Sequence, residues 1–383
     1  MKVTTAMYTM KRGGSYDRFK MMIESFLEKQ WEVHCLSLSP IQIEHSCFHN
    51  HRTITPFRIR GGLGTKFVVL FLFPFYSLLI GWREKIDLFV AFGSLYAFLL
   101  AIPKWILKKP MVTLIRGDST IGLNIRKSNK FLLCLNRVVE YLGLLFSDRI
   151  ITVNTAIQRE IVKAIGEKKK TEVKVLFNNV PPIPISFQGE ILKTRTQWGI
   201  PEEAKVLVTA GVINPGKNIE IVIKSLARIG MNKLFLLIVG DGSAKRDFQY
   251  QNYLRELAET LGLARQVIFT GWLEKEKLWR IFRASDLFVL PSKSEGMPNV
   301  MLEALGIGLP CMGGRIPGIT DILENEKLMF DPSDEKAVTE KIRDFFCDVQ
   351  YSNDIIRLCQ DRKKFFVFDW KEKVFQMVTE GSM

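Results

Sequence analysis

The sequence predicts an α/β protein built from two doubly wound, Rossmann-like domains. Short β-branched or apolar runs alternate with helical stretches along the chain, which is the pattern of βαβ units and parallel sheets. This series occurs twice, and each time its first strand leads into a glycine-bearing turn, at Gly13-Gly14 and at Gly211–Gly216. A length of 383 residues fits two domains of roughly 150 to 200 residues each.

The strands predicted in the first half are the apolar runs Val3–Tyr8, Glu32–Leu38, Asp87–Phe92, Met111–Ile115, Arg149–Val153 and Val173–Phe177. Those predicted in the second half are Lys205–Ala210, Leu234–Val239, Val267–Phe269, Leu287–Leu290 and Leu309–Met312. Between the two series lies a Pro-rich stretch, Val180–Glu190, which cannot continue either sheet and is the natural linker. We therefore predict two domains, residues 1–182 and 190–369, that face each other across a cleft.

Net charge divides unevenly between the two halves. The chain holds 54 Lys and Arg against 40 Asp and Glu, a formal charge of +14. Residues 1–180 contain 27 basic and 13 acidic side chains, whereas residues 181–383 contain 27 of each, so the first half carries the whole excess. This asymmetry predicts an anionic partner for the first half: nucleic acid, an anionic membrane surface or a phosphorylated substrate.

The cysteines and apolar runs bear on the compartment. Six cysteines without paired spacing, and an N-terminus without a long apolar core, predict a reduced, cytoplasmic setting. The longest apolar run, Phe67–Trp82, contains Pro74 and falls short of the roughly 20 residues of a spanning helix. It is either an interfacial helix flanked by cations or a buried crossover helix. For the apolar stretch Lys130–Phe146 we expect a core helix rather than a membrane-docking one.

The histidines gather in one short segment. His45, Cys47, His49 and His51 alternate at period two, which on a strand places them on one face. Four ligands along one strand splay too far to close a tetrahedron around zinc. We therefore expect a solvated loop here rather than a zinc site.

Two glutamates lie in the segment SEGMPNVMLEALGIGLP, residues 294–310. Pro298 predicts a helix that begins near Asn299, so that Glu303 lies about one turn inside it and Glu295 in the preceding loop. Both carboxylates can then face one ligand over the helix N-terminus, where the dipole favours anions. Carboxylates also accept hydrogen bonds from sugar hydroxyls, although two solvated glutamates at a helix start are common without a function.

The run Ala210–Leu323 resembles the donor-binding domain of a retaining glycosyltransferase of family 4, which has the GT-B architecture. The resemblance rests on five segments in the family's order: AGVINPGKN (210–218), LLIVGDGS (236–243), VIFTGWL (267–273), ASDLFVLPSKSEGMPNVMLEAL (284–305) and GLPCMGGRIPGITDIL (308–323). The first half resembles the family more loosely. The resemblance implies an N-terminal acceptor domain, a C-terminal donor domain, and a final helix over residues 370–383 that crosses back onto the first domain.

The resemblance also implies roles for single residues. Glu303 would bind the ribose hydroxyls of the nucleotide, Glu295 the hydroxyls of the donor sugar, and Lys217 the diphosphate, whose charge grows as it departs. Gly13 and Gly14 would let a loop of the first domain approach the diphosphate. The other residues implied at the donor site are Gly211, Gly240, Gly271, Trp272 and Leu273, with the last three lining the base pocket, and Gly296, Met297, Pro298, Asn299 and Val300.

The chain departs from the family at two positions. Val212 stands where members usually carry an arginine, so one cation of the phosphate clamp is missing; this either weakens catalysis or shifts the role to another basic residue, Arg315 or Arg116. Arg116-Gly117 stands where many members have His-Gly. We expect Arg116 to face a phosphate of donor or acceptor and Asp118 to contact an acceptor hydroxyl; the alternative is a local ion pair between the two.

The resemblance therefore implies a retaining hexosyltransferase whose donor is a UDP-linked hexose or N-acetylhexosamine. No DxD-like cluster is placed to bridge a diphosphate through a metal, so we predict no essential metal or cofactor. The basic first domain favours a lipid-linked or polysaccharide acceptor at the inner face of the cell membrane, to which the enzyme would bind peripherally. It contains no recognisable nucleic-acid module, so no nucleic acid is expected as partner. A soluble acceptor and a non-catalytic relative remain the alternatives.

Overall fold

The computed structural model describes residues 1–7, 14–52, 63–117, 130–166, 173–183 and 191–380. The chain divides into two compact units. The first consists of Met1–Phe177 together with Asp369–Met383, and the second of Asn178–Phe368. The second unit thus begins a few residues before the Pro-rich stretch, and the last residues of the chain belong to the first unit.

The first unit is built on a parallel sheet of seven strands in the order β3-β2-β1-β4-β5-β6-β7. Its strands are β1 (Lys2–Met7), β2 (Glu32–Ser37), β3 (Phe48–Arg52), β4 (Leu88–Phe92), β5 (Met111–Ile115), β6 (Arg149–Thr152) and β7 (Val173–Val175). Every residue of β4 and β5 is buried, because helices cover both faces of a parallel sheet.

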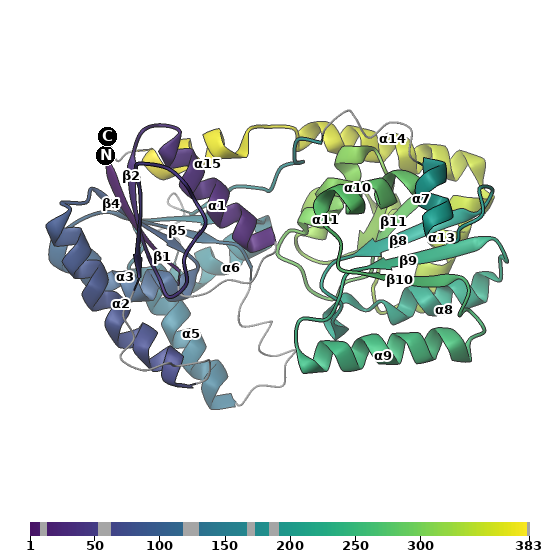
Figure 1. Ribbon diagram of the computed structural model, residues 1–383, viewed down its shortest axis with the longest axis horizontal. Helices are drawn as coiled ribbons and strands as arrows, with labels where there is room; N and C mark the ends of the chain where they lie inside the picture. Colours follow the sequence, from purple (N-terminus) through teal and green to yellow (C-terminus); the bar gives the residue numbers. More distant parts are fainter. Residues whose placement is uncertain (8–13, 53–62, 118–129, 167–172, 184–190, 381–383) are drawn as a thin grey trace. The chain divides into compact units, whose positions relative to one another are not determined.

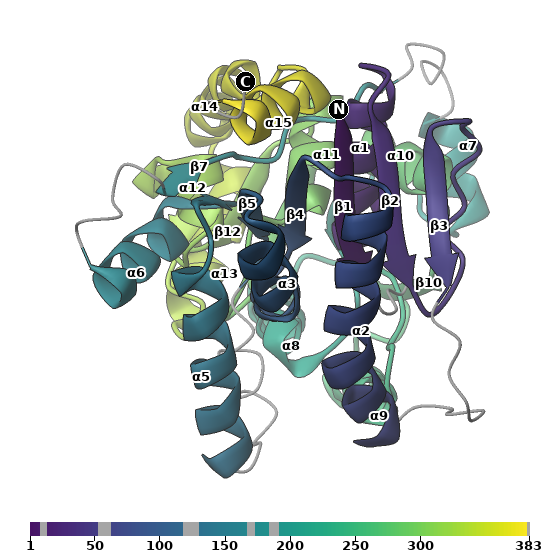
Figure 2. The same ribbon diagram turned by 90° about the vertical axis from the view of Figure 1, so that its left-hand side faces the viewer.

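The helices of the first unit lie on the two faces of its sheet. They are α1 (Gly14–Leu27), α2 (Leu63–Arg83), α3 (Ser94–Leu107), α5 (Lys130–Leu145), α6 (Thr155–Ile165) and α15 (Trp370–Thr379). Figure 2 shows α2, α3 and α5 side by side on one face, where α3 packs against both of its neighbours. On the opposite face α15 packs on α1, with the ring of Trp370 fully buried and Lys371 paired to Glu24 and Glu28.

The second unit repeats this plan with a six-stranded parallel sheet in the order β10-β9-β8-β11-β12-β13. Its strands are β8 (Lys205–Ala210), β9 (Leu234–Val239), β10 (Val267–Gly271), β11 (Leu287–Leu290), β12 (Cys311–Gly314) and β13 (Met329–Phe330). Its α-helices are α7 (Ile191–Gln197), α8 (Glu220–Ile229), α9 (Lys245–Thr260), α10 (Lys275–Ala284), α11 (Asn299–Ile307), α12 (Ile319–Leu323), α13 (Glu335–Cys347) and α14 (Val349–Phe365). Figure 1 shows α10 and α11 on one face of this sheet and α8 and α9 on the other.

Aspartates start the last three helices of the chain. The carboxylates of Asp334, Asp348 and Asp369 accept backbone N–H groups three residues ahead, in the first turns of α13, α14 and α15. An N-cap of this kind satisfies a donor that the helix itself leaves open, and the negative charge suits the positive end of the helix dipole. The local sequence therefore sets where the chain enters each helix.

The predicted α/β class is confirmed, and each strand predicted from the sequence overlaps an observed one. Two expectations are wrong. The segment Phe48–Arg52 is an edge strand paired with β2, and not a solvated loop. α5 is not a core helix, because Leu135, Val138 and Tyr141 along it are exposed. The apolar run within α2 has two sides: Phe73 and Ile80 are buried, whereas other large side chains of that helix face solvent.

The strand orders identify where ligands bind in folds of this class. In each sheet the chain winds outward in one direction from the first strand and then returns to wind in the other, so the direction reverses between β1 and β4 and between β8 and β11. Ligands of doubly wound sheets bind at the carboxyl ends of the strands at such reversals. The loops that follow β8 and β11 are therefore the first place to look for a site in the second unit.

Candidate functional site

The loops after β8 and β11 meet at the reversal point of the second sheet. The backbone N–H of Lys293 donates to the carbonyl of Gly216 at 2.8 Å and ties the two loops together. Each loop contributes one charged side chain, Lys217 from the first and Glu295 from the second. The sheet topology therefore brings together residues that are 78 positions apart in the chain.

Lys217 and Glu295 form an ion pair at the centre of this site. Lys217 Nζ lies 2.5 Å from Glu295 Oε1, and the hydroxyl of Ser292 donates to the same oxygen at 2.7 Å. The two charged side chains are only 17% and 13% exposed. Because the pair is largely withdrawn from water, it is screened less than a surface ion pair, and its geometry is defined by three groups rather than two.

The loop that carries Lys217 is shaped by two asparagines. The side chain of Asn214 accepts the N–H of Gly216 at 2.9 Å and starts a single 3₁₀ turn, Pro215–Lys217. Asn218 follows in the left-handed region, with φ of 56°, and its buried amide donates to the carbonyl of Pro332 at 2.7 Å. Asparagine tolerates this backbone conformation and can bond the chain locally, so the turn positions the lysine side chain.

The ends of β8, β9 and β10 join through Gly240. Its N–H donates to the carbonyl of Gly271, and its φ is +128°. A Cβ on Gly240 would lie 1.9 Å from the carbonyl oxygen of Gly211. A glycine is therefore required here on two counts, backbone conformation and space.

The loops after β9 and β10 are held by Asp241, which the sequence reasoning missed as a functional position. One oxygen of its carboxylate accepts the N–H of Trp272 at 2.8 Å and the other the amide of Gln251 at 3.2 Å. Asp241 lies inside the quoted segment LLIVGDGS, which is the signal that could have singled it out. The indole of Trp272 is exposed at this edge, and Leu273 follows it.

The loop before α11 has a close backbone contact of its own. Gly318 has a φ of +83°, and a Cβ there would lie 2.1 Å from the carbonyl oxygen of Gly296. The next residue, Met297, accepts hydrogen bonds from Asn178: the backbone N–H donates to the sulfur and the side-chain amide donates to the carbonyl, each at 3.1 Å. Asn178 is a second residue that sequence reasoning did not assign to the site.

Glu303 lies where the sequence predicts it, one turn inside α11. That helix begins at Asn299 with Pro298 at its N-cap, and Val300 lies in its first turn. The indole N–H of Trp279, from α10, donates to Glu303 Oε2 at 3.4 Å. The carboxylate of Glu303 is thus oriented by α10, whereas that of Glu295 is oriented by Lys217 and Ser292.

In the first unit Arg116 follows β5, beside a second arginine. Its guanidinium donates to the carbonyl of Leu176 at 3.3 Å and lies 5.6 Å from the ring centroid of Trp370. Arg18 lies 5.2 Å from the same ring and is buried. Burial and the positive charge of Arg18 lower the pKa of Arg116 well below its usual value. An anion bound next to these two guanidiniums would offset both effects.

Arg116 also lines a cavity of about 340 Å³ at the carboxyl ends of β4 and β5. Ser94 and Tyr96 from the start of α3 and Asn136 and Glu140 from α5 contribute further polar side chains to its wall. The cavity lies beside the reversal point of the first sheet, where ligands of this fold class bind.

Of the remaining predicted positions, the structure describes some and not others. Gly13 and Asp118 lie outside the described residues, and Gly14 is the first residue of α1. Arg315 forms an exposed ion pair with Glu326. Val212 lies two residues before Asn214, which starts the turn that carries Lys217, and its carbonyl accepts a hydrogen bond from the Asn214 amide at 3.1 Å.

Residues 190–359 match the family model described as glycosyl transferases group 1. Over these residues the second unit is similar to group 1 glycosyl transferases. The segments that build the Lys217–Glu295 site all lie within this match.

Curated relatives match about half of the chain. An uncharacterised glycosyltransferase, MJ1607 of Methanocaldococcus jannaschii, is 28% identical over 193 residues, which cover 49% of this chain and 47% of that protein. A D-inositol 3-phosphate glycosyltransferase of Stackebrandtia nassauensis is 31% identical over 180 residues, covering 45% of this chain and 40% of the relative. The chain therefore matches less than half the length of each.

Solved structures share the fold over the full length of the chain. Anabaena Alr3699/HepE, in complex with UDP and glucose, superposes with a TM-score of 0.76 at 20% identity and covers 99% of this chain and 98% of its own. WaaG, a glycosyltransferase involved in lipopolysaccharide biosynthesis, superposes with a TM-score of 0.71 at 16% identity, covering 99% and 100%. At these identities the likeness establishes the two-unit GT-B fold.

The junction at Gly240 predicts an asymmetry between two glycine substitutions. Gly240→Ala should lower the melting temperature strongly, because its Cβ collides with backbone. Gly230→Ala is the matched control: Gly230 also has a positive φ, of +66°, but open space around its Cβ, so only the conformational cost of roughly 1 to 2 kcal/mol applies. Thermal unfolding monitored by circular dichroism compares the two. Equal losses would contradict the packing of the three strand ends.

Proposed function

We propose that the chain is a retaining glycosyltransferase that moves a hexose or N-acetylhexosamine from a UDP-linked donor onto a lipid-linked or polysaccharide acceptor at an anionic membrane surface. The observation that carries the proposal is the Lys217–Glu295 pair at the reversal point of a domain similar to group 1 glycosyl transferases. The ammonium of Lys217 suits the diphosphate of a sugar nucleotide, and the carboxylate of Glu295 suits the hydroxyls of its sugar. The two groups lie 2.5 Å apart, so one ligand can reach both.

In this proposal the donor diphosphate replaces Glu295 as the partner of Lys217. The lysine then stabilises the charge that builds on the departing diphosphate, while the freed carboxylate of Glu295 accepts hydrogen bonds from sugar hydroxyls. Glu303 binds the ribose hydroxyls, and the N-terminus of α11 adds its dipole to the phosphate site. These groups supply the stabilisation without a bound metal.

The proposed transfer retains the anomeric configuration of the sugar. The bond between the anomeric carbon and the phosphate oxygen breaks through an oxocarbenium-like transition state, and the acceptor oxygen bonds to the same face. The departing phosphate takes the proton of the acceptor hydroxyl. The name of the structural neighbour crystallised with UDP and glucose supports a UDP-linked hexose as donor.

For the acceptor we propose the cavity beside Arg116 in the first unit. Its polar wall suits a hydroxylated molecule, and the guanidiniums of Arg116 and Arg18 suit a phosphate on that molecule. A relative named D-inositol 3-phosphate glycosyltransferase supports a phosphorylated acceptor. A lipid-linked phosphate has the same recognition chemistry.

The proposed membrane surface is the outer face of α2, α3 and α5. Large apolar side chains are exposed along it: Leu70, Phe71, Phe75, Leu79 and Trp82 on α2, Ile102, Trp105 and Ile106 on α3, and Leu135, Val138, Tyr141 and Leu145 on α5. These three helices lie side by side (Figure 2), so their exposed residues form one face. No helix of the described residues is long and apolar enough to span a membrane.

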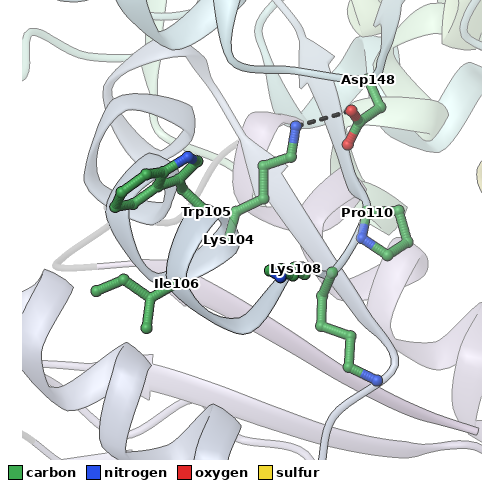
Figure 3. Close-up of a pocket in the computed structure, with 7 residues that line it drawn as sticks. Lys104, Trp105, Ile106, Lys108, Pro110 and Asp148 are labelled. Carbon is green, nitrogen blue, oxygen red and sulfur yellow. Dashed lines mark hydrogen bonds and ion pairs between the residues drawn. The ribbon is translucent and has the colours of Figure 1, made fainter.

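Cations accompany the apolar residues on this face. Lys104, Lys108 and Lys109 line a cavity of about 660 Å³ together with Trp105 and Ile106 (Figure 3). Lys104 is engaged, since its Nζ lies 2.7 Å from Asp148 Oδ1. Lysines beside exposed tryptophan are typical of proteins that bind the interface of an anionic bilayer, where the ring enters the headgroup level and the ammonium meets lipid phosphate.

The donor proposal is tested by following UDP-glucose with ¹H NMR as the protein hydrolyses it with water as acceptor. Lys217→Met and Glu295→Gln should each lower the initial rate about 100-fold, because each removes a group that stabilises the transition state. The same spectra report the anomer released first, which the retaining mechanism predicts to be α-glucose.

Lys293→Met provides the control for this assay. Lys293 lies in the same loop as Glu295, but its ammonium is half exposed and lies 3.9 Å from Glu220, so its loss should leave the rate almost unchanged. Equal hydrolysis by the wild type, Lys217→Met and Glu295→Gln would defeat the donor site, and a β-anomer released first would defeat retention.

The membrane proposal is tested by liposome flotation. The wild type should float with vesicles that contain anionic lipid and less with zwitterionic ones, and Phe75→Ala, Trp82→Ala and Trp105→Ala combined should abolish flotation. Each of these side chains would lose roughly 1.5 to 3 kcal/mol of burial in the bilayer. The matched control replaces three exposed apolar residues of the second unit, Phe248, Val349 and Val367, with alanine.

A soluble acceptor is the second candidate, favoured by the relative that acts on D-inositol 3-phosphate according to its name. It predicts that the wild type stays at the bottom of the gradient with every vesicle composition. The soluble acceptor would be excluded if the wild type and the control variant of the second unit both float, while the triple variant of α2 and α3 does not.

A further inference from the structure

Strand pairing in the first unit brings three imidazoles together at the edge of the sheet. β2 and β3 run parallel in a register that places His34 opposite His49, and His51 two positions further along the same face of β3. The ring of His34 stacks on both, with centroids 4.8 Å from His49 and 5.2 Å from His51. Glu32, two residues before His34, lies on the same face of β2.

His34 has one nitrogen engaged and one without a partner. Its Nδ1 lies 3.0 Å from Nε2 of His51, within hydrogen-bond distance. The residue is only 3% exposed, and among the described residues its buried Nε2 has no hydrogen-bond partner, with Glu32 Oε2 nearest at 3.8 Å. A buried polar atom without a partner costs free energy, so this nitrogen marks a position where a ligand would be stabilising.

We propose that Glu32, His34 and His49 form a binding site for a divalent transition-metal ion, with zinc as the expected occupant. One ligand atom from each of the three lies within 4.8 Å of the others, so small side-chain rotations bring them to zinc-binding distances of about 2.0 to 2.2 Å. Two imidazole nitrogens and a carboxylate are a donor set suited to zinc and unsuited to calcium or magnesium, which prefer oxygen ligands.

The surroundings of the cluster fit a bound ion. A cavity of about 560 Å³ opens onto the three side chains and leaves room for solvent in the remaining coordination position. The contact with His51 holds the other ring nitrogen of His34 and so orients the ring, and a metal-binding histidine almost always has its second nitrogen hydrogen-bonded in this way.

Two ion pairs lie at the cavity, and one of them shares a carboxylate with the proposed site. Lys2 Nζ lies 2.7 Å from Glu32 Oε2, and Arg83 pairs with Glu84 at 2.7 Å beside the cluster. The Lys2–Glu32 pair is more than one-third exposed on both sides, so exchanging the lysine for a metal ion costs little. The carboxylate also has a second oxygen that can bind the ion while the first stays near Lys2.

A metal ion at this site would stabilise the pairing of β3 with β2 and would take no part in sugar transfer. β3 is an edge strand in which only Phe48 is apolar and no residue is fully buried, so little apolar packing holds it to β2. A metal ion bound by two residues of β2 and one of β3 would cross-link the pair of strands. This inference is independent of the proposed function, because the donor site lies in the other unit and uses none of these residues.

Zinc binding by the chelator-treated full-length chain tests the proposal. Isothermal titration with ZnCl₂ should give one ion per chain, and zinc should raise the melting temperature by mass action whereas Mg²⁺ should not. His49→Gln and Glu32→Gln, both at partly exposed positions, should each lower zinc affinity by about 10-fold or more. Circular dichroism verifies that these variants remain folded.

His45→Gln is the matched control, because His45 precedes β3 and is exposed but lies outside the three-residue cluster. Its affinity for zinc should equal that of the wild type. Absence of stoichiometric zinc binding to the wild type would overturn the proposal. So would an affinity that is unchanged in His49→Gln, or one that falls equally in His45→Gln, since either result would show adventitious binding to surface histidines.

Discussion

The ion pair between Lys217 and Glu295 is the interaction around which the second unit is organised. It joins the loops after β8 and β11 where the winding of the sheet reverses, and Ser292 fixes the carboxylate from a third direction. Withdrawing two charges from water is costly unless each has a partner. In the proposed enzyme the pair satisfies both charges before the donor arrives, and a diphosphate then takes over the role of Glu295 at the lysine.

The two units share one topology but differ in net charge, and this difference fits the different ligands proposed for them. The second is electrically balanced, so a nucleotide sugar is recognised there by a few placed groups rather than by bulk potential. The first carries the excess positive charge together with Arg116 at its cavity and the apolar face of α2, α3 and α5. A long-range attraction to an anionic surface and a local acceptor pocket can therefore belong to the same unit.

Strands were predictable where both faces are buried, because a short continuous apolar run such as Leu287–Leu290 is typical of a buried strand in a parallel sheet. β3 was not predictable as a strand, because FHNHR is polar apart from Phe48 and its stability as a strand comes from pairing with β2. The same reason hid the imidazole cluster: spacing within one strand placed ligands too far apart, whereas His34 and His49 meet across two strands. Lys217 and Glu295 could be chosen by family resemblance, but their direct contact, and the bracing by Asp241 and Asn178, depend on tertiary structure.

In the proposed donor site, Lys217 exchanges the carboxylate of Glu295 for the diphosphate of the donor. Isothermal titration of UDP and of uridine into the wild type and Lys217→Met tests it most directly, because the two ligands differ only in the group that the lysine is proposed to bind. We predict that the variant loses about 10-fold or more in affinity for UDP, the loss of a charge-assisted contact, while uridine binds both proteins equally. Equal affinity of the two proteins for UDP would contradict the account.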